Sequence, residues 1–364
     1  VSRKIVEALQ LELTSEDERR FARRPQASGD ALDLYFKGRV ALLHETIPAV
    51  NQAIEYFERA LQIEPGNAAI SIALADAYCR LAFTWDPEGG WYERAKEVSN
   101  RALALDPDIP EGHYIRGRLA WTPQGGFQHE YAMREIVAAL AERPNLNEGF
   151  DWLATILFHV GLPDEARLYY AHALVINPDD MLAHTHAMTG EWLTGNYAAT
   201  VKTASETPEG LETSWATYME AFAHLRLGNL AAAQKTIESA TRRFPANILF
   251  HSARAVLSAL QKNESAAMLD IERTMQNRKA YGHFHHAELD IACALAILGR
   301  KDAAMDRLTS AVHSGFPCLP AVANDPLLAS LRSHPRYGDL IQELREQREH
   351  FANIFAGLRR LISS

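Results

Sequence analysis

Three histidines that lie close together in the sequence are the residues best suited to metal chemistry. His283, His285 and His286 are followed by Glu288 and Asp290, and imidazole and carboxylate groups are common ligands of zinc. Their spacing matches no recognised ligand pattern, so we predict no metal site and interpret the cluster as capping and solvating the start of the next helix. Metal binding by this cluster stays as the alternative hypothesis.

The other motifs that were compared with known chemistry give no sign of catalysis. The pair His129-Glu130 is followed by Met133 where a zinc protease needs a second histidine, and the pair His44-Glu45 lacks that histidine as well. The sequence contains no phosphate loop of the form GxxxxGKS or GxxxxGKT, no GxGxxG and no GxSxG. We therefore predict no enzymatic activity, no catalytic residues and no cofactor within these residues.

Composition and charge argue against several classes of protein. The chain has 364 residues, of which 47% are hydrophobic and 23% are charged, and its net charge is -9. Such an acidic chain lacks the basic surface that binds nucleic acid. Its longest apolar stretch, 291–298, is too short to cross a bilayer. The widely spaced Cys79, Cys293 and Cys318 suggest a reducing compartment. We expect a cytoplasmic protein that binds neither nucleic acid nor membrane.

Prolines and alanines recur together along the chain and indicate an internal repeat. Each of five prolines follows one alanine by five residues and another by twelve. These prolines are Pro65, Pro107, Pro144, Pro178 and Pro245. Their successive intervals are 42, 37, 34 and 67 residues, and Pro208 divides the last interval into 30 and 37. The intervals lie near the ~34-residue period of a helix-turn-helix repeat.

Between these prolines, apolar residues recur at intervals of three and four, which predicts an all-α protein. Alanines seven apart, such as Ala166 and Ala173, share one helical face and let a neighbouring helix approach closely, while Tyr170 fills the gap between them. The sequence resembles the tetratricopeptide repeat family, most clearly over 147–180 with Gly161 at the turn. This resemblance implies a right-handed α-solenoid of about eight helix pairs.

The repeats are uneven in length, and the surplus residues carry aromatic side chains. We divide the chain into an N-terminal helix and linker at 1–30, a solenoid at 31–320, and C-terminal capping or association helices at 321–364. The surplus residues of the second and third repeats contain or adjoin Trp85, Trp91 and Trp121. These tryptophans either form a contact surface for a partner or fold back to fill gaps between helices.

The order of these irregularities is also similar to the C-terminal repeat region of bacterial multidomain regulators. The resemblance rests on the segments 13–20, 31–39, 325–328 and 331–337. It implies an upstream effector domain, commonly a winged-helix DNA-binding, nucleotide cyclase or Ser/Thr kinase domain, none of which is visible in these residues. The chain is then a regulatory portion of a larger signalling or transcription regulator, and any enzyme activity lies outside it.

In tetratricopeptide arrays the first helix of each pair lines a concave groove, which implies where a partner binds. By position, the groove residues are Asp151, Thr155 and Phe158 in the clearest repeat, Thr185, Thr189 and Trp192 in the next, and Tyr218 and Phe222 in the one after. The groove is expected to be aromatic with few charges. We expect a protein or peptide partner for this interaction scaffold, and the alternative is a sensor whose superhelix encloses a small molecule.

An apolar stripe marks the last helix of the chain. Its members recur at intervals of three and four, and they are Leu340, Ile341, Leu344, Phe351, Ile354, Phe355, Leu358 and Leu361. A solenoid needs a cap at its end, but this stripe is longer than a cap requires. We expect the helix to cap the array, and its surplus length either to form a homodimer or to pack on an absent domain.

Overall fold

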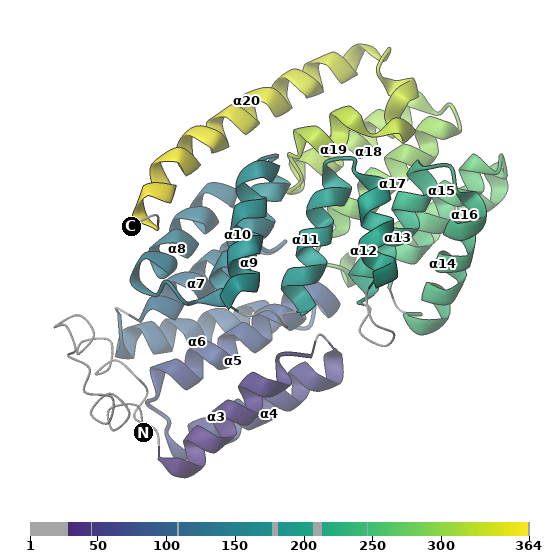
Figure 1. Ribbon diagram of the computed structural model, residues 1–364. Helices are drawn as coiled ribbons and strands as arrows, with labels where there is room; N and C mark the ends of the chain where they lie inside the picture. The colour runs from purple at the N-terminus through teal and green to yellow at the C-terminus, as the bar shows by residue number, and fades with distance from the viewer. Residues whose placement is uncertain are drawn as a thin grey trace.

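A computed structural model describes residues 28–44, 46–107, 109–176, 181–206, 213–245 and 247–362 of the chain, and the predicted first helix lies outside them. Within these residues the fold is all-α, and the helices α3 to α18 form eight consecutive pairs (Figure 1). The first four pairs are α3 (Gly29–Ala41) with α4 (Ile47–Ile63), α5 (Ala68–Arg80) with α6 (Trp91–Leu105), α7 (Pro110–Ala120) with α8 (His129–Glu142), and α9 (Asn147–His159) with α10 (Pro163–Ile176). The next four are α11 (Met181–Leu193) with α12 (Tyr197–Glu206), α13 (Ser214–Arg226) with α14 (Leu230–Arg243), α15 (Leu249–Leu260) with α16 (Glu264–Gln276), and α17 (Phe284–Ile297) with α18 (Lys301–His313).

Local sequence signals define the ends of these helices. The side chains of Thr46 and Asn67 accept hydrogen bonds from backbone amides in the first turns of α4 and α5, which caps both helices. Gly161 and Gly228, at the turns within two pairs, have φ angles of 78° and 75°, a conformation that side chains other than glycine rarely adopt. The predicted turn at Gly161 is therefore present in the structure.

Small residues lie where the paired helices touch. Ala53, Ala60, Ala166 and Ala173 are fully buried, and so is the Tyr170 side chain between the last two. Close approach of two helices needs side chains of this size at the contact. The solenoid of about eight helix pairs that the sequence predicts is confirmed.

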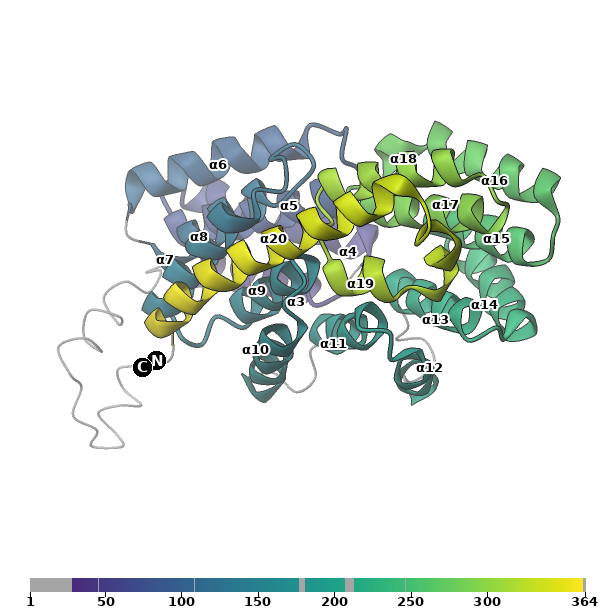
Figure 2. The same ribbon diagram turned by 90° about the horizontal axis from the view of Figure 1, so that it is seen from above.

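The superhelix curls until its last pair meets its first half, a feature that the repeat pattern does not predict. Lys279, just before α17, pairs with Glu88, just before α6, with Nζ and Oε1 2.7 Å apart. The rings of Phe83 and His283 lie 4.1 Å apart between their centroids. Seen from above, the two halves of the array face each other beneath a long last helix (Figure 2).

That last helix, α20 (Pro335–Leu358), runs back along the array and packs on α8. Phe355 and Leu358 are buried there, and Arg348 Nε donates a hydrogen bond to the carbonyl oxygen of Gly161 at 2.8 Å. The inner face of the stripe is therefore covered by the same chain, whereas Leu361 at its end is exposed. The homodimer stays a prediction, now restricted to the part of the stripe that remains uncovered.

A short segment between α18 and α20 anchors the last helix to the array. It comprises α19 (Leu319–Asn324) and a 3-10 helix over Pro326–Leu331. Buried Asp325 accepts two hydrogen bonds from Arg226 of α13, at 3.0 and 2.6 Å, and also caps the backbone amide of Leu327. Burying these two charges is tolerable because they pair with each other.

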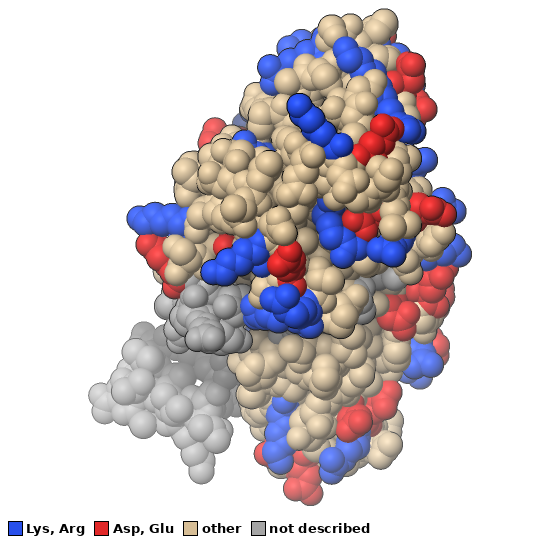
Figure 3. All heavy atoms as spheres, turned by 90° about the vertical axis from the view of Figure 1, so that its right-hand side faces the viewer, with Lys and Arg blue, Asp and Glu red and all other residues tan. Residues whose placement is uncertain are grey.

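Charge on the outer surface is mixed. On the face shown in Figure 3, positive and negative side chains are interspersed among larger uncharged areas. Among the described helices, none combines the length and the apolar character that crossing a lipid bilayer requires.

Candidate functional site: a cavity on the concave face

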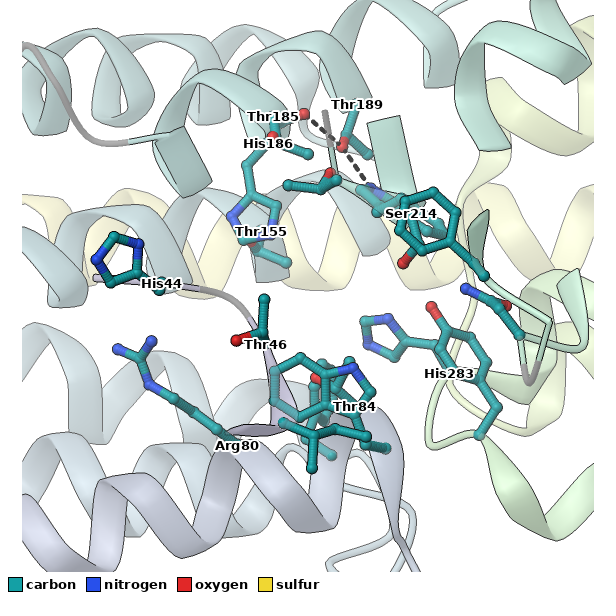
Figure 4. Close-up of a pocket in the computed structure, with 18 of the residues that line it drawn as sticks. His44, Thr46, Arg80, Thr84, Thr155, Thr185, His186, Thr189, Ser214 and His283 are labelled. Atoms are coloured by element: carbon teal, nitrogen blue, oxygen red, sulfur yellow. Dashed lines mark hydrogen bonds between the residues drawn. The ribbon is translucent and has the colours of Figure 1, made fainter. Parts of the chain in front are cut away.

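The curled superhelix encloses a cavity of about 640 Å³ on its concave side. Its walls come from α5, α7, α9, α10, α11, α13 and the end of α14, together with the segments before α4, α15 and α17. In Figure 4, Thr185, His186 and Thr189 line one side, Arg80 and Thr84 line the opposite side, and His283 lies at one end. A volume of this size suits a small molecule or a few residues of a peptide.

A π-helical turn brings α5 into the cavity wall. Residues Leu81–Trp85 continue α5 with this wider winding, and Phe83, Thr84 and Trp85 from it line the cavity. Such turns are rare and are often found at functional positions. The turn falls where the second repeat carries its surplus residues, so the insertion contributes directly to the concave surface.

Hydrogen bonds fix the polar side chains of the α9 and α11 wall. Asp151 lies behind this wall and accepts from His186 Nδ1 at 2.8 Å. The hydroxyl groups of Thr155 and Tyr170 are 2.9 Å apart. The hydroxyl oxygen of Thr189, where the dashed lines of Figure 4 meet, accepts from Trp215 Nε1 at 2.9 Å. Rotamers held in this way lose little further entropy when a ligand binds.

The charged residues that line the cavity are basic although the chain as a whole is acidic. Arg80, Arg118 and Arg243 line it, and none of the described lining residues is Asp or Glu. Arg80 and Arg118 share one buried carboxylate, Asp76, at 3.2 and 3.0 Å. Burial opposes the charge on Asp76, but the two guanidinium groups outweigh it and hold the pKa of Asp76 below its ordinary value.

Aromatic rings occupy much of the remaining surface. Phe83, Trp85, Trp152, Trp215 and Phe244 are among the lining residues. The Trp152 ring also carries the Arg118 guanidinium at 3.7 Å from its centroid, a cation–π contact that fixes the orientation of both groups. Rings beside arginines favour a ligand that combines a flat or apolar group with a negative charge.

Four of the predicted groove residues lie together at this cavity, and one supports it. Thr155, Phe158, Thr185 and Thr189 line the cavity, and Asp151 anchors His186 from behind. Of the predicted tryptophans, Trp85 also lines it, whereas Trp91 lies away from it and stacks on Tyr78. That these residues bind a partner stays a prediction.

The other predicted groove residues are part of the core, which corrects the expected groove. Trp192, Tyr218 and Phe222 are 3%, 0% and 0% exposed, and none of them lines the cavity. They are covered because the curled array packs α17 against this region, where the Tyr218 hydroxyl donates to Asp290. Trp121 is likewise buried, so it fills a gap between helices and offers no contact surface.

The histidines at the start of α17 also differ from their expected place. His283, His285 and His286 are 8%, 1% and 0% exposed, so they do not solvate the helix start. His159 of α9 joins them, and one ring nitrogen from each of the four lies within 4.8 Å of the others. His159 and His283 also line the cavity.

Sequence reasoning missed several residues of this cavity. Arg80 and His186 carry no motif, and His159 precedes the other three histidines by more than a hundred positions. Only the closure of the superhelix brings them together. The one sequence feature that points to this cavity is the surplus segment after α5, which contains Trp85.

Comparisons with known proteins agree with this architecture. Residues 49–82 and 218–282 match two family models, each described as tetratricopeptide repeat. A protein named putative adenylate cyclase 3 from Rhizobium meliloti (strain 1021) is 30% identical over 126 residues, which is 33% of this chain and 21% of that protein. The match thus spans about a fifth of the relative's length.

Solved structures share the fold at low sequence identity. The human IFIT1 dimer with PPP-AAAA has a TM-score of 0.50 and 16% identity, over 72% of this chain and 68% of that one. The APC/C hetero-tetramer Cut9-Hcn1 has a TM-score of 0.47 and 13% identity, over 93% of this chain and 78% of that one. At these identities the likeness concerns the fold alone.

Proposed function

Because the chain is a tetratricopeptide repeat protein, and such repeats support a protein-interaction scaffold, we propose that it holds a short peptide segment of a partner protein in its concave cavity. The observation that carries this proposal is the lining of the cavity. Three arginines and several aromatic rings surround about 640 Å³, and no carboxylate is among the described lining residues. The segment that fits has a carboxylate next to an aromatic or large apolar side chain.

Two tryptophans from the same insertion provide a matched test of this proposal. Trp85 and Trp91 are both half-buried, but only Trp85 lines the cavity. We expect selection from a library of random heptapeptides to enrich peptides with an acidic residue beside an aromatic one. Trp85→Ala should weaken their binding by about 1 kcal/mol or more, whereas Trp91→Ala should leave it unchanged, as measured by calorimetry.

Two results of that experiment count against the proposal. One is a library that yields no binding peptide. The other is a set of peptides that lose affinity with Trp91→Ala but keep it with Trp85→Ala, because their binding surface is then on the outside of the insertion.

A sensor that encloses a small molecule is the second candidate function. The observation that favours it is the cavity volume, which falls in the range of ~300–1,000 Å³ common for small-molecule sites. Native mass spectrometry of the purified chain distinguishes the two candidates. A bound molecule of defined mass, lost with Trp85→Ala and kept with Trp91→Ala, supports the sensor.

We also propose that the chain is a regulatory portion of a larger bacterial signalling protein. The match to a protein named as a putative adenylate cyclase supports this, and it covers only 21% of that protein. Its catalytic activity then belongs to residues outside the present chain. The purified chain is expected to form no cyclic nucleotide from ATP, and formation of one places the activity here instead.

A cytoplasmic location belongs to the same proposal. Cys79, Cys293 and Cys318 are free and buried, as is usual where thiols stay reduced. Fractionation of cells that express the natural protein tests this, and recovery of the protein outside the cytoplasm contradicts it.

A further inference from the structure

Four buried histidines converge from two helices that are far apart in the sequence. His159 ends α9, His283 directly precedes α17, and His285 and His286 lie in the first turn of α17. Each offers one ring nitrogen, and the four nitrogens all lie within 4.8 Å of one another. Side chains that merely fill a core have no need to point their polar atoms at a common centre.

The spacing of one nitrogen pair is that of two ligands on a single metal ion. His159 Nε2 and His286 Nε2 are 3.3 Å apart. Two nitrogens bound tetrahedrally at ~2.0–2.1 Å from zinc are separated by about 3.3 Å. The other separations reach 4.8 Å, so the remaining rings must turn inward by about 1–1.5 Å to complete the same tetrahedron.

Two of the rings are already oriented for coordination by backbone carbonyl groups. His159 Nδ1 lies 2.8 Å from the carbonyl oxygen of Thr155, and His285 Nδ1 lies 3.3 Å from that of Ser314. A carbonyl oxygen can only accept, so each Nδ1 carries the proton and each Nε2 has an unprotonated lone pair, which in His159 faces His286 Nε2. This is the arrangement that metal-binding histidines commonly have.

Several nitrogens of the cluster have no hydrogen-bond partner among the described residues. These are His283 Nε2, His285 Nε2 and His286 Nδ1. A buried polar atom without a partner costs about 1–3 kcal/mol, and a metal ion bound by the cluster would satisfy His283 Nε2 and His285 Nε2.

The nearby carboxylates are engaged elsewhere, which leaves a ligand set of imidazoles alone. Glu288 accepts hydrogen bonds from Ser310 and Ser314, and Asp290 accepts from Tyr218 and Ser252. Imidazole nitrogens suit zinc and its neighbours in the first transition row and do not suit calcium or magnesium. The rings of Trp121 and Phe316 lie against the cluster and cover part of it.

We propose that His159, His283, His285 and His286 bind one divalent transition-metal ion, with zinc as the physiological candidate. The ion joins α9 to α17 and so ties the first half of the superhelix to its last pair. It would thereby hold the cavity in its closed form. This inference is independent of what the cavity binds.

The test uses the full chain without a histidine tag, after removal of metal by a chelator. We expect calorimetry to show one equivalent of Zn²⁺ bound, and Co²⁺ to give the intense visible absorption of a tetrahedral nitrogen site. Bound Zn²⁺ should also raise the melting temperature, because it binds only the folded state. His285→Gln should weaken Zn²⁺ binding at least tenfold.

His129→Gln is the matched control. His129 is also buried, but it is outside the four, and its Nδ1 accepts from Trp121 Nε1 at 2.8 Å. This variant should bind Zn²⁺ like the wild type. A folded wild-type chain that takes up no saturable equivalent of Zn²⁺ overturns the proposal, even if the variants fail to fold. Equal affinity in wild type and His285→Gln overturns it as well.

Discussion

The helices α9 and α13 hold equivalent places in their repeats, yet the structure uses their inner faces differently. Thr155 and Phe158 of α9 line the cavity. Phe158 is itself almost fully buried, so the two helices differ in contact with the cavity rather than in burial. Tyr218 and Phe222 of α13 do not line it, and Tyr218 donates its hydroxyl hydrogen to Asp290 of α17. Position within a repeat therefore predicts a groove only where the array stays open. Where the superhelix curls onto itself, the same positions become core.

The sharpest test of this difference is Phe222→Ala. Phe222 contacts the Tyr218 ring at 4.9 Å between centroids and supports the Arg226 guanidinium. Loss of such a ring from a core costs about 3–5 kcal/mol of unfolding free energy. Chemical denaturation of the wild type and the variant measures this loss. A loss below about 1 kcal/mol means that Phe222 is at the surface and that α13 belongs to the groove after all.

The contact between α13 and α17 also makes stability depend on pH through Asp290. Burial raises the pKa of Asp290 to about 7, against the opposing effects of its hydrogen bond from Ser252, the charge of Arg226 and its bond from Tyr218. The pKa of Asp290 is higher in the folded protein than in the unfolded one, so protonation of this carboxyl group stabilises the fold. This stabilisation is complete below about pH 4 and is lost as the pH rises through about 7.

We expect Asp290→Asn to remove this dependence. The stability of the wild type relative to this variant should fall by about 3 kcal/mol between pH 5 and pH 8. Comparing the two proteins at each pH cancels the titration of the histidines, which both contain. A difference that does not change with pH contradicts the raised pKa.

The last helix, α20, and the turn that follows it offer the same comparison between a buried and an exposed apolar side chain. Phe355 is 2% exposed and packs edge-on against Tyr169, whereas Leu361 is 57% exposed. Phe355→Glu should lower the unfolding free energy by roughly 2–3 kcal/mol at unchanged mass. Leu361→Glu should leave stability unchanged. Sedimentation then tests the homodimer, because a wild-type dimer that Leu361→Glu dissociates places the interface at the uncovered end.

The smallest change in stability is expected where α9 and α10 contact each other. Ala173 is fully buried, and Val175 two residues later is 78% exposed. Ala173→Leu should destabilise the protein by about 1–3 kcal/mol, because the added methyl groups overpack the contact, while Val175→Leu should change stability little. A neutral thermal shift for Ala173→Leu means that the alanine spacing marks no close contact.

The fold could be predicted from the sequence because each repeat depends on neighbours in sequence. Alanines seven apart, turn glycines and terminal prolines act within one or two helices, so Ala166, Ala173 and Gly161 are recognisable without a structure. The cavity depends on contacts between distant repeats. His159 and His286 are 127 positions apart, and no local pattern reports their approach.

The same reasoning explains which candidate residues were misplaced. Asp151, Thr155, Phe158, Thr185 and Thr189 belong to repeats whose inner faces remain at the cavity or directly behind it. Tyr218, Phe222 and Trp192 fall where α17 and the segment around Asp325 cover the array. Curvature accumulates over many repeats, so a sequence pattern of one repeat cannot show where it closes.

The closure of the superhelix on itself can be measured as the distance between two residues. Glu88 and Lys279 are exposed and paired across the closure. Spin labels on Glu88→Cys and Lys279→Cys can be read by pulsed electron resonance, since the native cysteines are buried and react slowly. We predict a single short distance. A long and broad distribution of distances would show instead that the array is open and that α17 does not meet the first half.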